Sequence, residues 1–145
     1  MRRSVVAAIA IVAGVGAGLA ADDPIHARKD LMDANGKTTK AVVAIMKGAA
    51  PFDLETVQAA LNAYIATSEK APALFPPGTE TGGKTQALPA IWTNKSDFEA
   101  RFAKLGEDSK AALAAIKDPA TFKTSFPPVL KNCQGCHETY RAKEQ

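Results

Sequence analysis

The sequence has few aromatic residues, few cysteines and little excess charge. Aromatic residues make up 6% of its 145 residues, and there are only two cysteines and two histidines. Two cysteines are too few for a disulfide scaffold. The formal net charge of +3 excludes a nucleic-acid-binding protein whose affinity depends on clustered positive charge. Apolar residues, at 46%, are numerous enough to form a core, which argues against disorder.

Alanine is abundant, and strand patterns are absent. The chain contains 29 alanines, and alanine favours helices and is depleted in strands. No segment alternates between apolar and polar residues as a half-buried strand does. Composition and length together predict one helical domain.

The first 20 residues have the pattern of a secretory signal peptide. A positive start at Met1–Arg3 precedes an uncharged run over residues 4–19, and Gly18–Ala20 supplies small residues for cleavage. A membrane anchor is the alternative, but the run is short and only weakly hydrophobic. We expect cleavage after Ala20, which leaves a mature domain of residues 21–145, exported in a bacterium to the periplasm. No later segment is long and apolar enough to span a membrane.

Start and stop signals predict two helices in the first half of the mature chain. The Asp-Asp-Pro of residues 22–24 suits the opening of the first helix, which Gly48 and Pro51 end. Asp53 suits the N-cap of the second helix, and Pro72 stops it.

Two further helices follow a long connection over residues 71–95, whose apolar side chains indicate that it packs on the domain. Ser96–Glu99 predicts a capping box at the start of the third helix. Asp118–Pro119 caps the fourth helix, which runs to about Lys143, and Pro127–Pro128 is expected to break or kink it. These elements predict an all-α fold, an antiparallel up-down-up-down four-helix bundle.

Residues 133–137 read Cys-Gln-Gly-Cys-His, the C-x-x-C-H motif of covalent haem attachment. Cys133 and Cys136 lie on nearly one face of a helix, so each thiol can add to one of two vinyl groups on one edge of a haem. His137 follows directly and can bind the iron. A redox disulfide expects a βαβ setting and a zinc site needs a second pair of ligands, and the sequence has neither. The motif therefore predicts one haem c, held by two thioethers.

The sixth ligand of the iron has three candidates in the mature chain: Met32, Met46 and His26. In an antiparallel bundle the start of the first helix lies beside the end of the fourth, where the motif sits. Met32 is then level with the haem, whereas Met46 lies about 21 Å further along the helix axis. His26 lies about 9 Å from Met32 along the axis and on another face. Bundle geometry favours Met32, but it leaves open that Met32 is an ordinary core residue.

A helical bundle with C-x-x-C-H near its C-terminus resembles the class II cytochromes c, which are cytochrome c' and its low-spin relatives. Most c-type cytochromes carry the motif near the N-terminus, so this placement is specific. The similarity covers the whole mature chain. It includes residues 28–32 (Arg-Lys-Asp-Leu-Met), 75–78 (Phe-Pro-Pro-Gly), 87–92 (Ala-Leu-Pro-Ala-Ile-Trp) and Arg141, one turn after the motif.

The resemblance implies roles for three more residues. In the family the distal residue lies four positions after an arginine, which corresponds to Met32 after Arg28. Low-spin members use such a methionine as sixth ligand and carry electrons. Five-coordinate members leave the site open and bind small gases such as nitric oxide or carbon monoxide. The resemblance also implies that Arg28 and Arg141 lie near the haem, although each has an ordinary solvated helix arginine as its alternative.

The sequence therefore favours an exported electron carrier with His137 and Met32 on the iron, working with redox partner proteins. The five-coordinate, gas-binding cytochrome c' is the alternative. An enzyme is not expected, because a haem peroxidase needs distal acid–base residues and no histidine is placed near Met32. Members of the family are often homodimers through the first two helices, although some are monomers, and both states stay open here.

Overall fold

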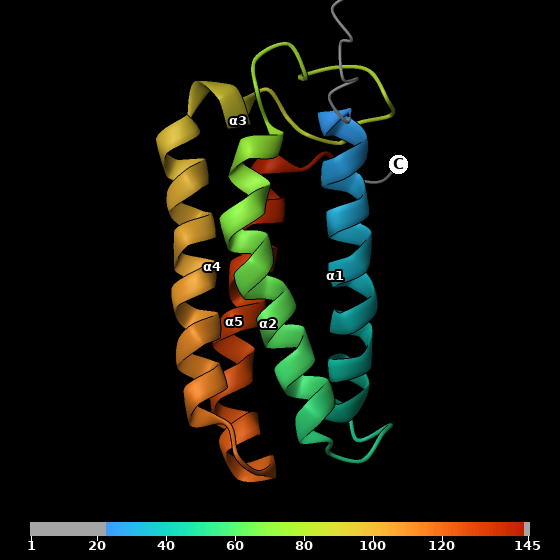
Figure 1. Ribbon diagram of the computed structural model, residues 1–145, viewed down its shortest axis with the longest axis vertical. Helices are drawn as coiled ribbons and strands as arrows, with labels where there is room; N and C mark the ends of the chain where they lie inside the picture. Colours follow the sequence, from blue (N-terminus) through green and yellow to red (C-terminus); the bar gives the residue numbers. More distant parts are fainter. Residues whose placement is uncertain (1–22, 144–145) are drawn as a thin grey trace, which may run out of the picture.

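The computed structural model describes residues 23–143. Its four long helices run up and down in an antiparallel bundle (Figure 1), as the sequence predicts. They are α1 (Pro24–Met46), α2 (Leu54–Lys70), α4 (Lys95–Ala115) and α5 (Pro119–Tyr140). Between α2 and α4 lie the 3-10 helix η1 (Ala71–Leu74) and the single-turn helix α3 (Ala90–Thr93).

The predicted signal peptide, residues 1–20, lies outside the described part of the chain. Within residues 23–143, no helix has both the length and the apolar character that crossing a membrane requires. The same residues contain one isolated β-bridge, between Ala87 and Arg141.

Three long helices begin at the aspartates that the sequence predicts as caps. Asp23 and Asp53 each accept a hydrogen bond of 3.0 Å from a backbone amide of the first turn. Asp118 accepts from the amide of Thr121 at 2.8 Å, and the Thr121 hydroxyl accepts from the Asp118 amide at 3.1 Å. These contacts satisfy amides that have no partner inside their own helix.

The capping box predicted at Ser96–Glu99 is wrong. Helix α4 begins at Lys95, with Asn94 as its N-cap and no side-chain capping bond. The short helix α3 leads directly into α4, so the chain is already turning when α4 begins, and the Asn94 carbonyl accepts from the Phe98 amide. Asp97, inside the predicted box, bonds to side chains of α4 and α5.

The sequence predicts a break or a kink at Pro127–Pro128; helix α5 continues through both prolines, so the break is wrong. Prolines lack the amide hydrogen, which leaves the carbonyls of Lys123 and Thr124 without helical partners. Both of these residues are exposed, so water can bond to the freed carbonyls. The neighbouring Phe126 and Val129 are buried in the core, and this packing holds the helix together across the prolines.

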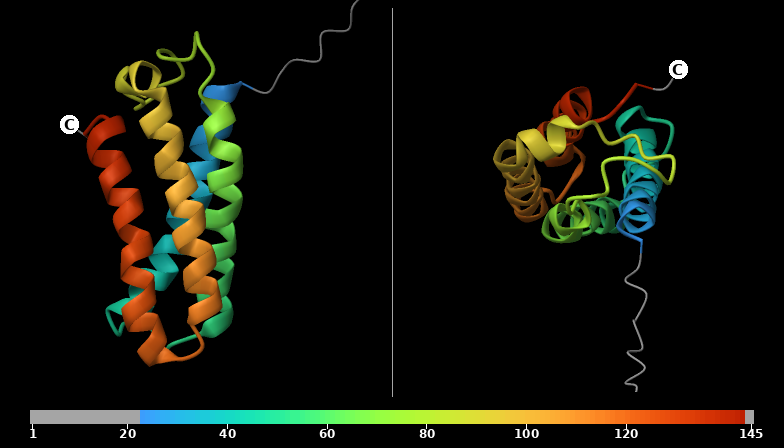
Figure 2. Two further views of the ribbon diagram at one scale, coloured as in Figure 1. Left: turned by 90° about the vertical axis from the view of Figure 1, so that its left-hand side faces the viewer. Right: turned by 90° about the horizontal axis from the view of Figure 1, so that it is seen from above.

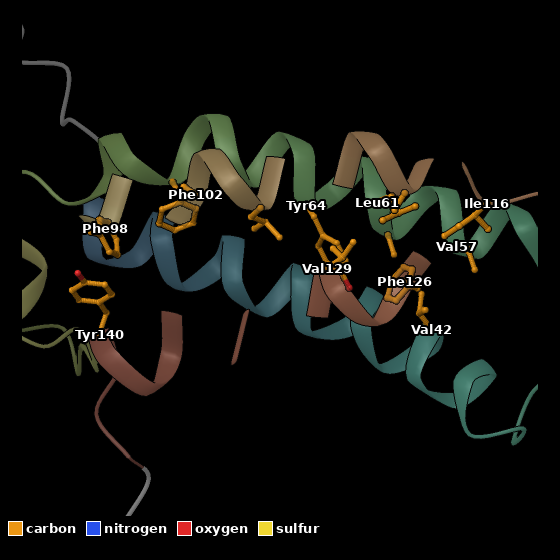
Figure 3. Packing of buried hydrophobic residues seen from close by; sticks show 14 of the residues in the cluster. Val42, Val57, Leu61, Tyr64, Phe98, Phe102, Ile116, Phe126, Val129 and Tyr140 are labelled. Atoms are coloured by element: carbon orange, nitrogen blue, oxygen red, sulfur yellow. The ribbon is translucent and has the colours of Figure 1, made fainter. Parts of the chain in front are cut away.

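The few aromatic residues are all used in packing, since each of the nine pairs with another ring. The ring centroid of Phe98 lies 4.8 Å from that of Phe75 and 5.2 Å from that of Tyr140. Tyr64 and Phe126, with centroids 6.3 Å apart, lie further along the bundle (Figure 3). The aromatic side chains thus bind α2, α4 and α5 to one another at two levels of the core.

Helices α2 and α4 pack closely because small residues line their contact. A Cβ atom at Gly106 would lie only 2.5 Å from Ser68 Oγ, so a larger residue there would force Ser68 to move. Ala60 of α2 and Ala112 of α4 are also buried. The abundant alanine therefore serves close packing as well as helix formation.

The connection from α2 to α4 crosses the end of the bundle where α1 begins and α5 ends (Figure 2). Arg28 of α1, a residue that is only 3% exposed, holds this connection against the bundle by hydrogen bonds. Its Nη1 donates to the Leu74 carbonyl at 3.3 Å and to the Thr79 hydroxyl at 3.0 Å. Its Nη2 donates to the Thr79 carbonyl at 2.8 Å and to the Thr85 hydroxyl at 2.7 Å. The connection therefore packs on the domain, as its apolar residues predict.

Replacing Arg28 by Met is expected to lower the free energy of unfolding by about 2–4 kcal/mol, because buried acceptors lose their donors. Urea unfolding of the purified protein measures this change. The matched control is Lys29→Met: Lys29 is exposed and makes one 3.1 Å bond to the Gly83 carbonyl, so a loss of about 0.5 kcal/mol or less is expected. Equal losses in the two variants would contradict the role of Arg28.

Candidate functional site

The last turns of α5 carry the C-x-x-C-H motif. Cys133 and Cys136 are free thiols, partly buried, and both pack against the hydrophobic core. Burial raises the pKa of both thiols, and for Cys136 the guanidinium of Arg101 opposes that rise. Thiols that lie three residues apart against an apolar core are well placed to hold an apolar group there.

His137 lies at the surface end of the motif. It lines a shallow hollow of about 460 Å³ at the end of α5, together with Gln134, Glu138, Arg141, Ala142 and Lys143. Although the side chain is exposed on one side, partial burial lowers the pKa of His137, and the Arg141 guanidinium lowers it further. The imidazole is therefore largely neutral at pH 7, which is the form that binds a metal.

The residues that follow the motif are held by the connection. The Leu88 amide donates to the Tyr140 carbonyl at 3.0 Å, and the Ala142 amide donates to the Gln86 carbonyl at 2.8 Å. Arg141 Nε donates to Gln86 Oε1 at 2.8 Å. The connection thus contacts both the end of α5 and the first turns of α1.

Met32 lies on α1, partly buried, and packs against the same hydrophobic core as Cys133 and Cys136. The start of α1 and the end of α5 occupy the same end of the bundle (Figure 2), as its antiparallel topology predicts. Helix α1 packs on α2, and α5 packs on α4. Met32 and the motif therefore reach the core from different sides of the bundle.

The other two candidate ligands lie elsewhere. Met46 is 40% exposed and lines a separate hollow of about 280 Å³ at the opposite end of the bundle. His26 is exposed, and its Nε2 lies 3.4 Å from Oδ2 of Asp30, four residues later on α1. Neither side chain joins the core against which the two cysteines pack.

The two arginines singled out from the sequence have distinct surroundings. Arg28 is buried, so the alternative of an ordinary solvated helix arginine is wrong for this residue. Four of its five N–H donors are bonded to the connection. Burial lowers the pKa of Arg28, while the Asp23 and Glu80 carboxylates oppose this shift. Arg141 is partly buried and lies beside His137, whose pKa it lowers. The structure therefore brings Arg141 to the motif and Arg28 to the segment that covers that end of the bundle.

A cluster of polar side chains next to the motif was not identified from the sequence. Arg101 of α4 donates from Nη1 to the Gly135 carbonyl at 2.8 Å and from Nε to Asp97 Oδ2 at 2.7 Å. The Tyr140 hydroxyl donates to the same Asp97 oxygen at 2.5 Å. These bonds from Tyr140 and Arg101 lower the pKa of Asp97. The four-residue spacing of Asp97 and Arg101 is the only signal in the sequence, and it does not indicate the contact with α5.

Polar residues also link α1 to α2 beyond Met32. Asn35 Nδ2 donates to the Thr67 hydroxyl at 2.8 Å, and the Thr39 and Tyr64 hydroxyls share a bond of 2.6 Å. Tyr64 and Thr67 are buried, so these bonds avoid the free-energy cost of burying hydroxyls without a hydrogen-bond partner. In the sequence, Tyr64 follows Val57 and Leu61 at helical spacing, a pattern that does not reveal these bonds.

The residues at this end of the bundle fit a covalent haem. Within residues 23–143, no group of three or more His, Cys, Asp or Glu side chains is arranged to hold a metal ion. Two free, partly buried thiols followed by a neutral imidazole match two thioether bonds and one axial nitrogen ligand.

Comparisons with known proteins agree with this fit. The family model described as Cytochrome C' matches residues 23–141. The chain is 44% identical over 134 residues to a cytochrome c' of Rhodopseudomonas palustris, with 92% of each chain covered. It is 38% identical over 121 residues to a cytochrome c-556 of Agrobacterium tumefaciens, covering 83% of this chain and 98% of that one. The solved structure of the Rhodopseudomonas palustris cytochrome c' matches with a TM-score of 0.83 at 45% identity, over 85% of this chain and 98% of that one.

Replacing Cys133 or Cys136 by Ala is expected to abolish full covalent haem attachment, because the motif assigns one of the two thioethers to each thiol. Haem staining of denaturing gels and the intact mass of the purified protein measure this. Gln134→Ala is the control, since Gln134 is exposed and bonds to Glu138 at 2.8 Å, and it should keep its haem. Complete attachment in either cysteine variant would contradict the interpretation of the motif.

Proposed function

The chain belongs to the cytochrome c' family, and we propose that it is an exported electron carrier whose haem iron is bound by His137 and Met32. Its cofactor is a covalent haem c at Cys133–His137, and like other members of the family it is not an enzyme. The proposal concerns the second axial ligand, the cellular compartment and the use of the haem.

In this proposal each residue of the motif has a separate task. Cys133 and Cys136 hold the haem by covalent bonds, which keep it in place in both oxidation states. His137 binds the iron through a ring nitrogen, which its lowered pKa leaves free of a proton. The haem supplies an iron centre that takes up and releases one electron.

The placement of Met32 carries the proposal for the second axial ligand. Met32 packs against the same core as the motif cysteines, whereas Met46 and His26 do not. A thioether bound to iron also favours the ferrous state, as in other electron-carrying cytochromes. Met32 is thus the one candidate among Met32, Met46 and His26 that both the packing and the position on α1 support.

A five-coordinate haem that binds small gases is the second candidate function. The relatives support both subtypes, because one similar protein is named cytochrome c' and another cytochrome c-556. In this alternative, Met32 is a core residue beside an open coordination site. The described residues are the same in both cases, so the two functions differ in a single bond to iron.

We further propose that the protein is exported to the periplasm after cleavage at Ala20 and exchanges electrons with redox partner proteins. The charged start and the uncharged run of residues 4–19 support export. Arg141 and Lys143 border the hollow beside His137, but Glu138 lies there too. The charge of this rim is therefore mixed, and a homodimer through α1 and α2 remains one of the two states suggested by the resemblance.

Absorption spectra of the ferric and ferrous protein, with and without carbon monoxide, test the ligation. Met32 ligation predicts a low-spin spectrum that carbon monoxide does not change. In Met32→Ala the sixth position opens, so the spectrum should become high-spin and respond to carbon monoxide. Met46→Ala is the matched control, because Met46 is exposed at the other end of α1, and its spectrum should equal that of the unmodified protein. A high-spin, gas-responsive spectrum of the unmodified protein would instead establish the five-coordinate alternative.

A further inference from the structure

Three side chains from two helices form a hydrogen-bonded cluster against the haem-attachment segment. Asp97 and Arg101 lie on successive turns of α4, with Arg101 Nε 2.7 Å from Asp97 Oδ2. Tyr140, at the end of α5, is buried and donates its hydroxyl proton to Asp97 at 2.5 Å. The Arg101 guanidinium carbon lies 5.3 Å from the centroid of the Tyr140 ring. The cluster therefore joins α4 to α5 directly beside the motif.

Arg101 reaches the motif itself. Its Nη1 donates a 2.8 Å hydrogen bond to the carbonyl of Gly135, which lies between the two cysteines. The same carbonyl accepts from the Thr139 hydroxyl at 3.2 Å. A guanidinium fixed by a carboxylate on one side holds this carbonyl in a defined direction, because its donors form a rigid planar fork.

We infer that Asp97 and Arg101 are positioning residues for the haem-attachment segment, and that their charges act on the reduction potential in opposite directions. The inference rests on haem attachment at Cys136, and it does not depend on Met32 as axial ligand. Arg101 donates to the carbonyl of Gly135, the residue before Cys136, at 2.8 Å, and Asp97 is paired with Arg101 at 2.7 Å, so both charges lie beside the Cys136 sulfur. A haem bonded to that sulfur is subject to the same two charges.

The direction of each effect follows from charge. The ferric haem carries one more positive charge than the ferrous haem, so a nearby cation disfavours the ferric state and a nearby anion favours it. In the intact pair, the two effects largely cancel. The Arg101 and Asp97 side chains are 35% and 54% exposed, so water screens each charge and moderate effects are expected.

Redox titration of the haem-loaded, full-length protein tests this inference. Asp97→Asn leaves Arg101 unopposed and should raise the potential, whereas Arg101→Gln leaves the carboxylate unopposed and should lower it. Each change should alter the ferrous-to-ferric ratio at a fixed ambient potential by roughly two- to tenfold, tenfold being about 59 mV for one electron. Arg101→Lys keeps the charge and should stay close to the unmodified protein.

The matched controls are Glu69→Gln and Lys110→Gln, which make the same changes of charge. Their ion pair, 3.6 Å between Lys110 Nζ and Glu69 Oε1, joins α2 to α4 and is well exposed. Neither control should shift the potential appreciably. Shifts of the same sign in Asp97→Asn and Arg101→Gln, or shifts no larger than in the controls, would overturn the inference.

Two outcomes separate this inference from the proposed function. A high-spin, gas-responsive spectrum refutes Met32 ligation, but opposite shifts in Asp97→Asn and Arg101→Gln would still support the role of the pair. If Arg101→Gln does not retain haem, Asp97→Asn decides alone: a raised potential supports the inference, and an unchanged or lowered one overturns it.

Discussion

The buried guanidinium of Arg28 is the interaction on which the haem end of this bundle depends. It uses four N–H donors to hold a segment that has little regular structure of its own. Burying such a charge is costly unless its donors are satisfied, and here carbonyls and hydroxyls of the connection satisfy them. The Phe75 ring, 4.7 Å from the guanidinium carbon, adds a cation–π contact. The connection is thereby fixed to α1.

The connection then passes this constraint to the other side of the site. Beyond its contacts with Arg28, it forms backbone hydrogen bonds to Tyr140 and Ala142, just after the motif. The connection therefore holds α1 at Arg28, four residues before Met32. It also holds the end of α5 at Tyr140, three residues after His137. In the proposed electron carrier, these two helices supply the axial ligands, so a fixed separation between them favours a small rearrangement on electron transfer.

Helix α4 contributes to the site without supplying a ligand. Its Arg101 holds the Gly135 carbonyl, and its Phe98 packs against the Tyr140 ring, so α5 is fixed by polar and apolar contacts together. The scarcity of aromatic residues fits this arrangement. All nine form ring pairs, and a covalent haem adds a large apolar surface to the core that the protein side chains do not provide.

The sequence alone determined those features whose causes lie within a few residues. Caps at Asp23, Asp53 and Asp118, the four-helix pattern and the C-x-x-C-H motif all follow from local hydrogen bonding, periodicity and spacing, and they were predicted. Long-range contacts decided the rest. Ser96–Glu99 has the sequence of a capping box, but α4 begins earlier, at Lys95, because α3 supplies the turn before it. Pro127–Pro128 does not break α5, because core packing outweighs the lost backbone bonds. The burial of Arg28 and the bond from Arg101 to Gly135 join residues 34 or more positions apart, and only the folded chain brings such partners together.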